Sequence, residues 1–96
     1  MRKYWLRLDE DFFDSDEMLI IESMPNGSKI MDILLKLYLK TIKSDGKLEK
    51  PYELKGYTME EIEAVMPVFR ELGIIQKTDS GDEFSYLWKE KAGADL

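Results

Sequence analysis

The stretch from Ser28 to Lys43, SKIMDILLKLYLKTIK, limits the possible folds of this chain more than any other segment. Its charged residues recur at steps of three and four, and they draw one narrow stripe along a helix: Lys29, Asp32, Lys36, Lys40 and Lys43. Nearly all other positions are apolar, so neighbouring elements must cover this helix on more than one side. We therefore predict that residues 28–43 form the central helix of the core.

Both ends of this central helix carry boundary signals. Asn26 and Gly27 are typical of a turn, and the hydroxyl of Ser28 can accept a hydrogen bond from a first-turn N–H group. Gly46 follows the helix and can leave it through a left-handed conformation. These residues predict a helix that begins at Ser28 and ends before Gly46.

The composition excludes several kinds of chemistry. The 96 residues are enough for one hydrophobic core and too few for two. The absence of cysteine and histidine excludes disulfides, thiolate metal sites and nucleophiles that need a histidine base. No segment has the apolar length of a signal peptide or a membrane span, which predicts a cytoplasmic protein. The net charge of −6 disfavours nucleic acid as a partner, although six lysines fall between Lys29 and Lys50.

The first 25 residues combine a strand pattern with an acidic helix start. Residues 3–8 alternate in character and are typical of a short strand. Phe12 and Phe13 interrupt the polar connection that follows, and we predict that both rings plug the core. An acidic cap ahead of residues 18–21 predicts a short first helix that ends before Pro25.

A third helix is predicted from Met59 to Leu72. Thr58 and Glu61 form a capping-box pattern at its start. Apolar residues then recur on one face, and Gly73 is placed to end the helix.

The remaining residues show the pattern of a β-hairpin. Residues 74–78 and 83–88 are strand-like and flank a four-residue tip that contains Gly81. On this assignment Phe84, Tyr86 and Trp88 share one face of the second strand. Residues 91–96 have no periodic apolar pattern, and we predict that they fray.

The order of these elements predicts an α+β fold, a winged helix-turn-helix with three main helices, an N-terminal strand and a C-terminal β-hairpin wing. We assign residues 1–90 to this domain and residues 91–96 to a tail. The third helix would take the recognition position, where side chains near the helix start enter a major groove. Those side chains include Glu60, Glu61 and Glu63, so the helix is acidic where DNA would lie.

Several blocks of the sequence resemble one protein family. They are Trp5-Leu6-Arg7-Leu8 with Asp11-Phe12-Phe13, the apolar block from Ile33 to Ile42, Asp45-Gly46-Lys47-Leu48, and Leu72-Gly73-Ile74-Ile75. Together they resemble the N-terminal domain of phage replisome organisers, which are relatives of the DnaD-like primosome proteins. The resemblance extends to about Trp88. The tryptophan strand with its double phenylalanine is the most specific part.

The resemblance implies a non-catalytic function in the initiation of phage or prophage DNA replication in a low-GC Gram-positive host. It implies binding to origin DNA, assembly with helicase-loading proteins, or both. Family members carry a second domain, so a natural protein that extends beyond Leu96 would be expected. The segment between Leu48 and Thr58 departs from the family, because it is shorter than the helix found there. The alternative function is a protein-interaction or self-association module without direct DNA contact.

The candidate nucleic-acid site lies between the central helix and the capped helix. Lysines that can meet phosphates alternate there with tyrosines that can stack or form hydrogen bonds: Lys47, Lys50, Tyr52, Lys55 and Tyr57. Double-stranded DNA would bind weakly and with strong salt dependence, because few phosphate contacts oppose the net charge. In the alternative interpretation, this segment is a solvated loop whose tyrosines cover the core.

The candidate interaction surface consists of Phe84, Tyr86 and Trp88. If these rings are uncovered, their strand is an edge that can pair with another copy of the chain. If they are covered, they pack on the central helix. No cofactor, metal or small-molecule substrate is expected, because the glycines are scattered and no serine has a base to activate it.

Overall fold

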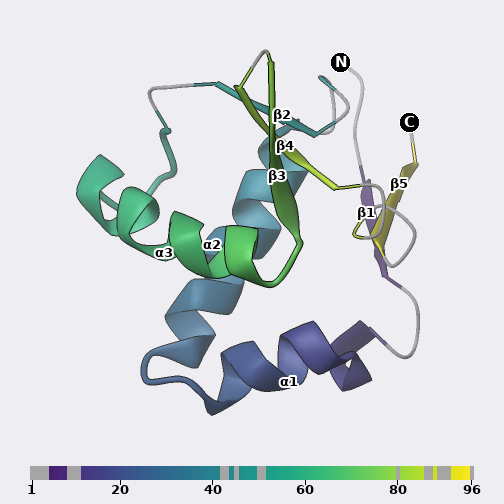
Figure 1. Ribbon diagram of the computed structural model, residues 1–96, viewed down its shortest axis with the longest axis vertical. Helices are drawn as coiled ribbons and strands as arrows, with labels where there is room; N and C mark the ends of the chain where they lie inside the picture. The colour runs from purple at the N-terminus through teal and green to yellow at the C-terminus, as the bar shows by residue number, and fades with distance from the viewer. Residues whose placement is uncertain are drawn as a thin grey trace.

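The computed structural model describes residues 5–8, 12–41, 44, 46–49, 52–79, 81–85, 88 and 92–95. Within these residues, the chain forms three α-helices and two antiparallel sheets, and one core joins the helices to the larger sheet. Helix α2 (Gly27–Thr41) runs through the centre of the molecule and α3 (Met59–Glu71) crosses it, whereas α1 (Asp16–Ser23) lies across one end of α2 (Figure 1). The predicted α+β class with three main helices is confirmed.

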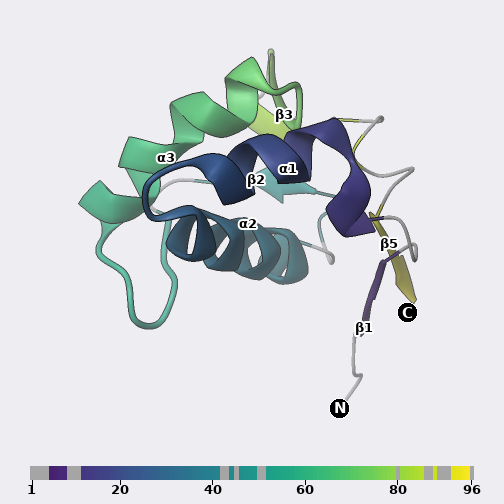
Figure 2. The same cartoon turned by 90° about the horizontal axis from the view of Figure 1, so that it is seen from below.

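Helix α2 is buried along one side over its whole length, and α1 and α3 lie beside it (Figure 2). The buried side chains are Ile30, Met31, Ile33, Leu34, Leu37, Tyr38 and Thr41. The helix begins at Gly27, directly after Asn26 in a turn with φ 62°. Ser28 therefore lies inside the first turn, and the prediction that it caps the helix is wrong by one residue.

Gly27 is required by the close approach of α1 to α2. A Cβ atom at this position would lie 2.4 Å from the carbonyl oxygen of Ile21 and 3.1 Å from that of Glu22. Both contacts are backbone atoms of α1, so they cannot move aside as the end of a flexible side chain could. The missing side chain of Gly27 therefore lets the two helices meet at this corner.

Helix α3 confirms the predicted apolar face and the predicted start at Met59, and it ends at Glu71, one residue before the predicted end. Ile62, Met66 and Phe69 are buried in the core. The helix is followed by Gly73 at φ 76°, a left-handed conformation that glycine adopts without strain. The N–H of Ile74 then donates to the carbonyl of Phe69 at 2.9 Å and closes the helix end.

Three strands form the larger sheet in the order β2-β4-β3. They are β2 (Lys47–Leu48), β3 (Ile75–Thr78) and β4 (Gly81–Phe84). The hairpin is tighter than predicted, because Gly81 at φ 121° pairs with Thr78 and already belongs to β4. Strand β4 therefore ends at Phe84, and Trp88 does not share a strand face with it.

The smaller sheet joins β1 (Trp5–Leu8) to β5 (Ala92–Asp95), with Trp5 opposite Asp95 and Leu8 opposite Ala92. The predicted N-terminal strand is confirmed over these residues. The prediction of a frayed tail is wrong for residues 92–95. Ladder hydrogen bonds join backbone groups whatever the side chains are, so this pairing needs no apolar pattern.

One of the two predicted aromatic plugs lies in the core. Phe12 and Phe13 belong to the 3₁₀-helix η1 (Phe12–Asp14), where Phe12 is 2% exposed and Phe13 is 46% exposed. Successive side chains of a 3₁₀-helix point about 120° apart, so adjacent rings cannot both face inward.

Among the residues that the structure describes, no helix is both long and apolar enough to cross a bilayer.

The α1–α2 corner gives a first prediction. Gly27→Ala should lower the free energy of unfolding by about 1–3 kcal/mol, because the new methyl group overpacks against backbone atoms. Ser28→Ala is the matched control, since Ser28 is an exposed neighbour in the same turn. Chemical denaturation of both variants tests this. An equal free energy of unfolding for Gly27→Ala and the parent chain would contradict this prediction, because it would show that α1 and α2 can move apart at this corner without loss of stability.

Candidate functional site

The described residues of the candidate nucleic-acid site gather around two adjoining hollows near the end of α2. The first hollow, about 380 Å³, is lined by Lys40, Lys47 and Tyr52, together with neighbours from α2 and β2. The second, about 550 Å³, is lined by Lys40, Tyr52, Lys55 and Tyr57, together with Met59 at the start of α3. Lys40 and Tyr52 belong to both hollows and join them into one face. Lys50 lies outside the described residues.

Glutamates share this lysine face. Glu49 lines the first hollow, and Glu53 lines both. The ammonium group of Lys40 donates to the backbone carbonyl of Glu53, which ties α2 to the segment before α3. Lys47 and Lys55 are exposed. The face is therefore basic with acidic interruptions, and its lysines reach the surface from three different elements.

Tyr52 is 5% exposed and belongs to the core. Its hydroxyl donates to Asp82 Oδ2 at 3.1 Å, and Arg70 Nη2 donates to the same oxygen at 2.8 Å. Burial and the bond to the carboxylate raise the pKa of the Tyr52 hydroxyl. The Arg70 guanidinium lowers the pKa of Asp82, and the hydroxyl of Tyr52 acts in the same direction. This cluster joins the segment before α3, the end of α3 and the hairpin.

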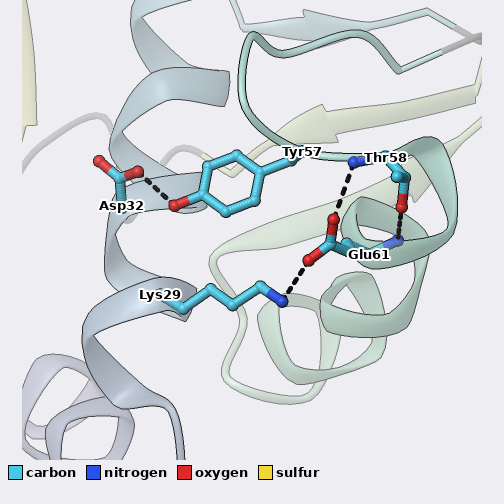
Figure 3. A network of polar contacts seen from close by, with 5 residues as sticks. All are labelled: Lys29, Asp32, Tyr57, Thr58 and Glu61. Atoms are coloured by element: carbon cyan, nitrogen blue, oxygen red, sulfur yellow. Dashed lines mark hydrogen bonds and ion pairs between the residues drawn. The ribbon is translucent and has the colours of Figure 1, made fainter.

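Tyr57 is held by the central helix. Its hydroxyl donates to Asp32 Oδ2 (Figure 3), and the same carboxylate pairs with Lys36 at 2.9 Å. These bonds lower the pKa of Asp32, with the Tyr57 contribution the larger. The hydrogen bond to Asp32 in turn raises the pKa of Tyr57. The ammonium group of Lys36 also lies 5.4 Å from the centre of the Tyr57 ring. The hydroxyls of Tyr52 and Tyr57 therefore both donate to carboxylates of the domain itself.

The start of α3 is closed by its own capping box. Thr58 Oγ1 accepts from the N–H of Glu61 at 3.1 Å, and the N–H of Thr58 donates to Glu61 Oε1 at 3.0 Å. The other carboxylate oxygen of Glu61 pairs with Lys29 of α2 (Figure 3). Lys29 and the Thr58 N–H together lower the pKa of Glu61. The predicted capping box is confirmed, and it keeps the carboxylate of Glu61 at the N-terminal end of α3.

The aromatic residues proposed as an interaction surface pack inside the molecule where the structure describes them. Phe84 is 1% exposed and Trp88 is 3% exposed. The Trp88 ring lies 5.3 Å from Phe12, 5.4 Å from Tyr38 and 5.9 Å from Phe84, measured between centroids. Tyr86 lies outside the described residues. These positions correspond to the alternative in which the rings cover the central helix.

One feature of this site had no signal in the sequence. The pair Arg70–Asp82 joins residues twelve positions apart that belong to different predicted elements. Lys40, by contrast, could be expected near the site from its place at the end of the central helix, and it lines both hollows. Within the described part of the chain, no group of three acidic side chains is placed to hold a metal ion.

The fold and this face define a small α+β domain, in which three helices are joined to a three-stranded antiparallel sheet with a hairpin. The family model described as N-terminal phage replisome organiser matches residues 5–95, so the chain belongs to that family. This confirms the resemblance found in the sequence and implies a role in phage DNA replication. Comparisons with curated proteins and with solved structures gave no match.

The Asp82 cluster gives a second prediction. Asp82→Asn should lower the free energy of unfolding by about 1–2 kcal/mol at neutral pH, because hydrogen bonds to a charged group are lost. The folded-state pKa of Asp82 lies below its unfolded value, so this contribution is present above about pH 4 and is lost as the pH falls further. Denaturation of both proteins between pH 7 and pH 3 should show their curves converging. Asp79→Asn, an exposed acid in the same hairpin, is the control.

Proposed function

We propose that this chain is a non-catalytic, winged-helix domain for the initiation of phage DNA replication, and that it touches DNA through phosphates rather than through bases. The sheet order β2-β4-β3 supports the winged-helix assignment, since the strand after the central helix pairs with the second strand of the hairpin. The segment that would form the preceding helix of a helix-turn-helix contains instead a Leu54–Tyr57 bridge and a turn. A non-catalytic role agrees with a sequence that has neither histidine nor cysteine.

The lysine face carries the DNA part of this proposal. Lys40, Lys47 and Lys55 come from α2, β2 and the turn before α3, and they line hollows that share residues. Lysine side chains of this kind meet phosphate oxygens and position a protein on DNA without reading sequence. Glu49 and Glu53 in the same hollows weaken this attraction. Affinity of about 10⁻⁴ to 10⁻⁶ M, as for non-specific binding, is therefore expected.

Helix α3 is poorly suited to contact DNA bases, because its first two turns carry three glutamates. Glu60 and Glu63 are exposed in its first two turns, and Glu61 is held by the capping box and by Lys29. Carboxylates that face a duplex are repelled by its phosphates. We therefore place sequence selection, if the full replication complex has it, outside this helix.

Charge reversal on the lysine face tests the DNA contact. The triple variant Lys47→Glu, Lys50→Glu and Lys55→Glu should lose duplex binding at low salt by at least tenfold, while the free energy of unfolding stays nearly unchanged. The slope of log affinity against log salt concentration should be steeper for the parent chain than for the triple variant. The difference should be about 0.9 for each replaced lysine that contacts phosphate. Fluorescence anisotropy with a labelled duplex measures both quantities.

A single reversal elsewhere separates this face from net charge alone. Lys77→Glu changes the charge on the exposed side of β3 by the same amount as Lys47→Glu or Lys55→Glu. The proposal expects a clear loss for the two site variants and a smaller one for Lys77→Glu. Equal losses in all three would mean that only the total charge matters, and the lysine face would have no special role.

Assembly with other replication proteins is the second candidate function, and one observation favours it. Three large apolar side chains of η1 and α1 are exposed: Phe13, Leu19 and Ile20. The hairpin aromatics do not support this function, because Phe84 and Trp88 are buried.

A further inference from the structure

Helix α1 has apolar side chains on two opposite sides. Met18 and Ile21 face the core and are at most 1% exposed, whereas Leu19 is 50% exposed and Ile20 is 46% exposed. At about 100° per residue, Asp16 and Ser23 lie at the centre of the side opposite Met18 and Ile21. Leu19 and Ile20 lie on this same outward side, one to each side of that centre. A surface helix normally has one apolar side, which packs on the core, and a polar side opposite it. The outward face of α1 is therefore unpartnered in the monomer.

Phe13 of η1, which precedes α1 in the chain, is a third exposed apolar side chain in this region. Its ring is 46% exposed and is held by an edge-on contact with the buried ring of Phe12, with 5.0 Å between centroids. We call Phe13, Leu19 and Ile20, with Asp16 and Ser23 between them, the α1 face. Three of the five large apolar side chains exposed in the described part of the chain belong to it. Such a concentration marks an interaction site more often than scattered surface residues do.

The charge around the α1 face selects its partner. Between residues 12 and 28 there are four acids and no base: Asp14, Asp16, Glu17 and Glu22. DNA and anionic lipid surfaces would be repelled. A second copy bound through the same face would bring these acids against their own equivalents, because a two-fold interface pairs each patch with itself. A basic partner has the opposite requirement, because its cations are attracted to carboxylates such as Asp14, Asp16 and Glu22.

We propose that the α1 face docks a basic amphipathic helix of a partner protein, one with leucine-like residues along one side and lysine or arginine beside them. The apolar side would cover Phe13, Leu19 and Ile20, and the cations would lie against Asp14, Asp16 and Glu22. This deepens the assembly function proposed above and is independent of DNA contact by the lysine face. Recognition of an amphipathic helix uses apolar anchors at steps of three and four, which a short helix face can match.

Designed peptides test the proposal on the full chain. The probe is an 18-residue helix with leucine at heptad positions a and d and lysine at most others. One control peptide has the same composition with the leucines scrambled, and another has glutamate in place of lysine. The probe should bind at least tenfold more tightly than either control, measured by anisotropy at about 50 mM salt. Equal binding of the probe and the scrambled peptide would reduce the interaction to net charge and overturn the proposal.

Variants of the chain locate the binding site. The double variant Leu19→Ser and Ile20→Ser should weaken the probe about tenfold or more, whereas Leu39→Ser should change binding less than twofold. Leu39 is 45% exposed on α2 and so matches the change in surface chemistry at another place. Amide shifts in NMR spectra should change around residues 12–24. Shifts confined to another surface, or an equal loss with Leu39→Ser, would overturn the proposal.

Two further measurements separate the alternatives. Sedimentation equilibrium of the chain alone should show a monomer, and self-association abolished by Leu19→Ser and Ile20→Ser would assign the face to a second copy instead. The lysine-face variant Lys47→Glu and Lys55→Glu should keep full affinity for the probe. If the parent chain binds the peptide but not DNA, the proposal for the lysine face has failed. If it binds DNA but not the peptide, the proposal for the α1 face has failed.

Discussion

Burial of α2 is the constraint on which the rest of the structure depends. A long helix with a wide apolar face is stable in water only when other elements cover that face. Helices α1 and α3 cover it, and Tyr38 brings the sheet and the C-terminal segment against it through ring contacts of 4.8 Å to Phe84 and 5.4 Å to Trp88. Its charged stripe is also used, since Lys29, Asp32 and Lys40 each hold a residue between Glu53 and Glu61. One helix thus positions both the core and the segment that carries the lysine face.

Features specified by neighbouring residues could be predicted from the sequence. The capping box at Thr58 and the glycine after α3 depend on a few adjacent positions, and both are found where the pattern places them. The central helix follows from its own periodicity. The pairing of β5 with β1 was missed, and the inward position of Trp88 was left open, because both depend on contacts between residues far apart in the sequence. Local patterns do not contain the partner, so they could not decide these cases.

The candidate site divides in the same way. The sequence identified the lysines, because charge and exposure are local properties of residues such as Lys47 and Lys55. It left the roles of Tyr52 and Tyr57 open, because their hydroxyl partners Asp82 and Asp32 are 30 and 25 residues away. The outward side of α1 was hidden for another reason. A short run of apolar residues shows that a helix is buried somewhere, but only the packed structure shows which of them remain uncovered.

The shared carboxylate of Asp82 has a consequence for how such domains diversify. Arg70 and Lys77 line the same hollow as Asp82, and the bond from Arg70 to that carboxylate keeps the guanidinium from other anions. Replacement of this one acid by a neutral residue would remove the carboxylate from the Arg70 guanidinium and make the hollow beside Lys77 more positive, at the expense of folding stability. A lineage could therefore exchange stability for surface charge at a single codon, without altering the architecture.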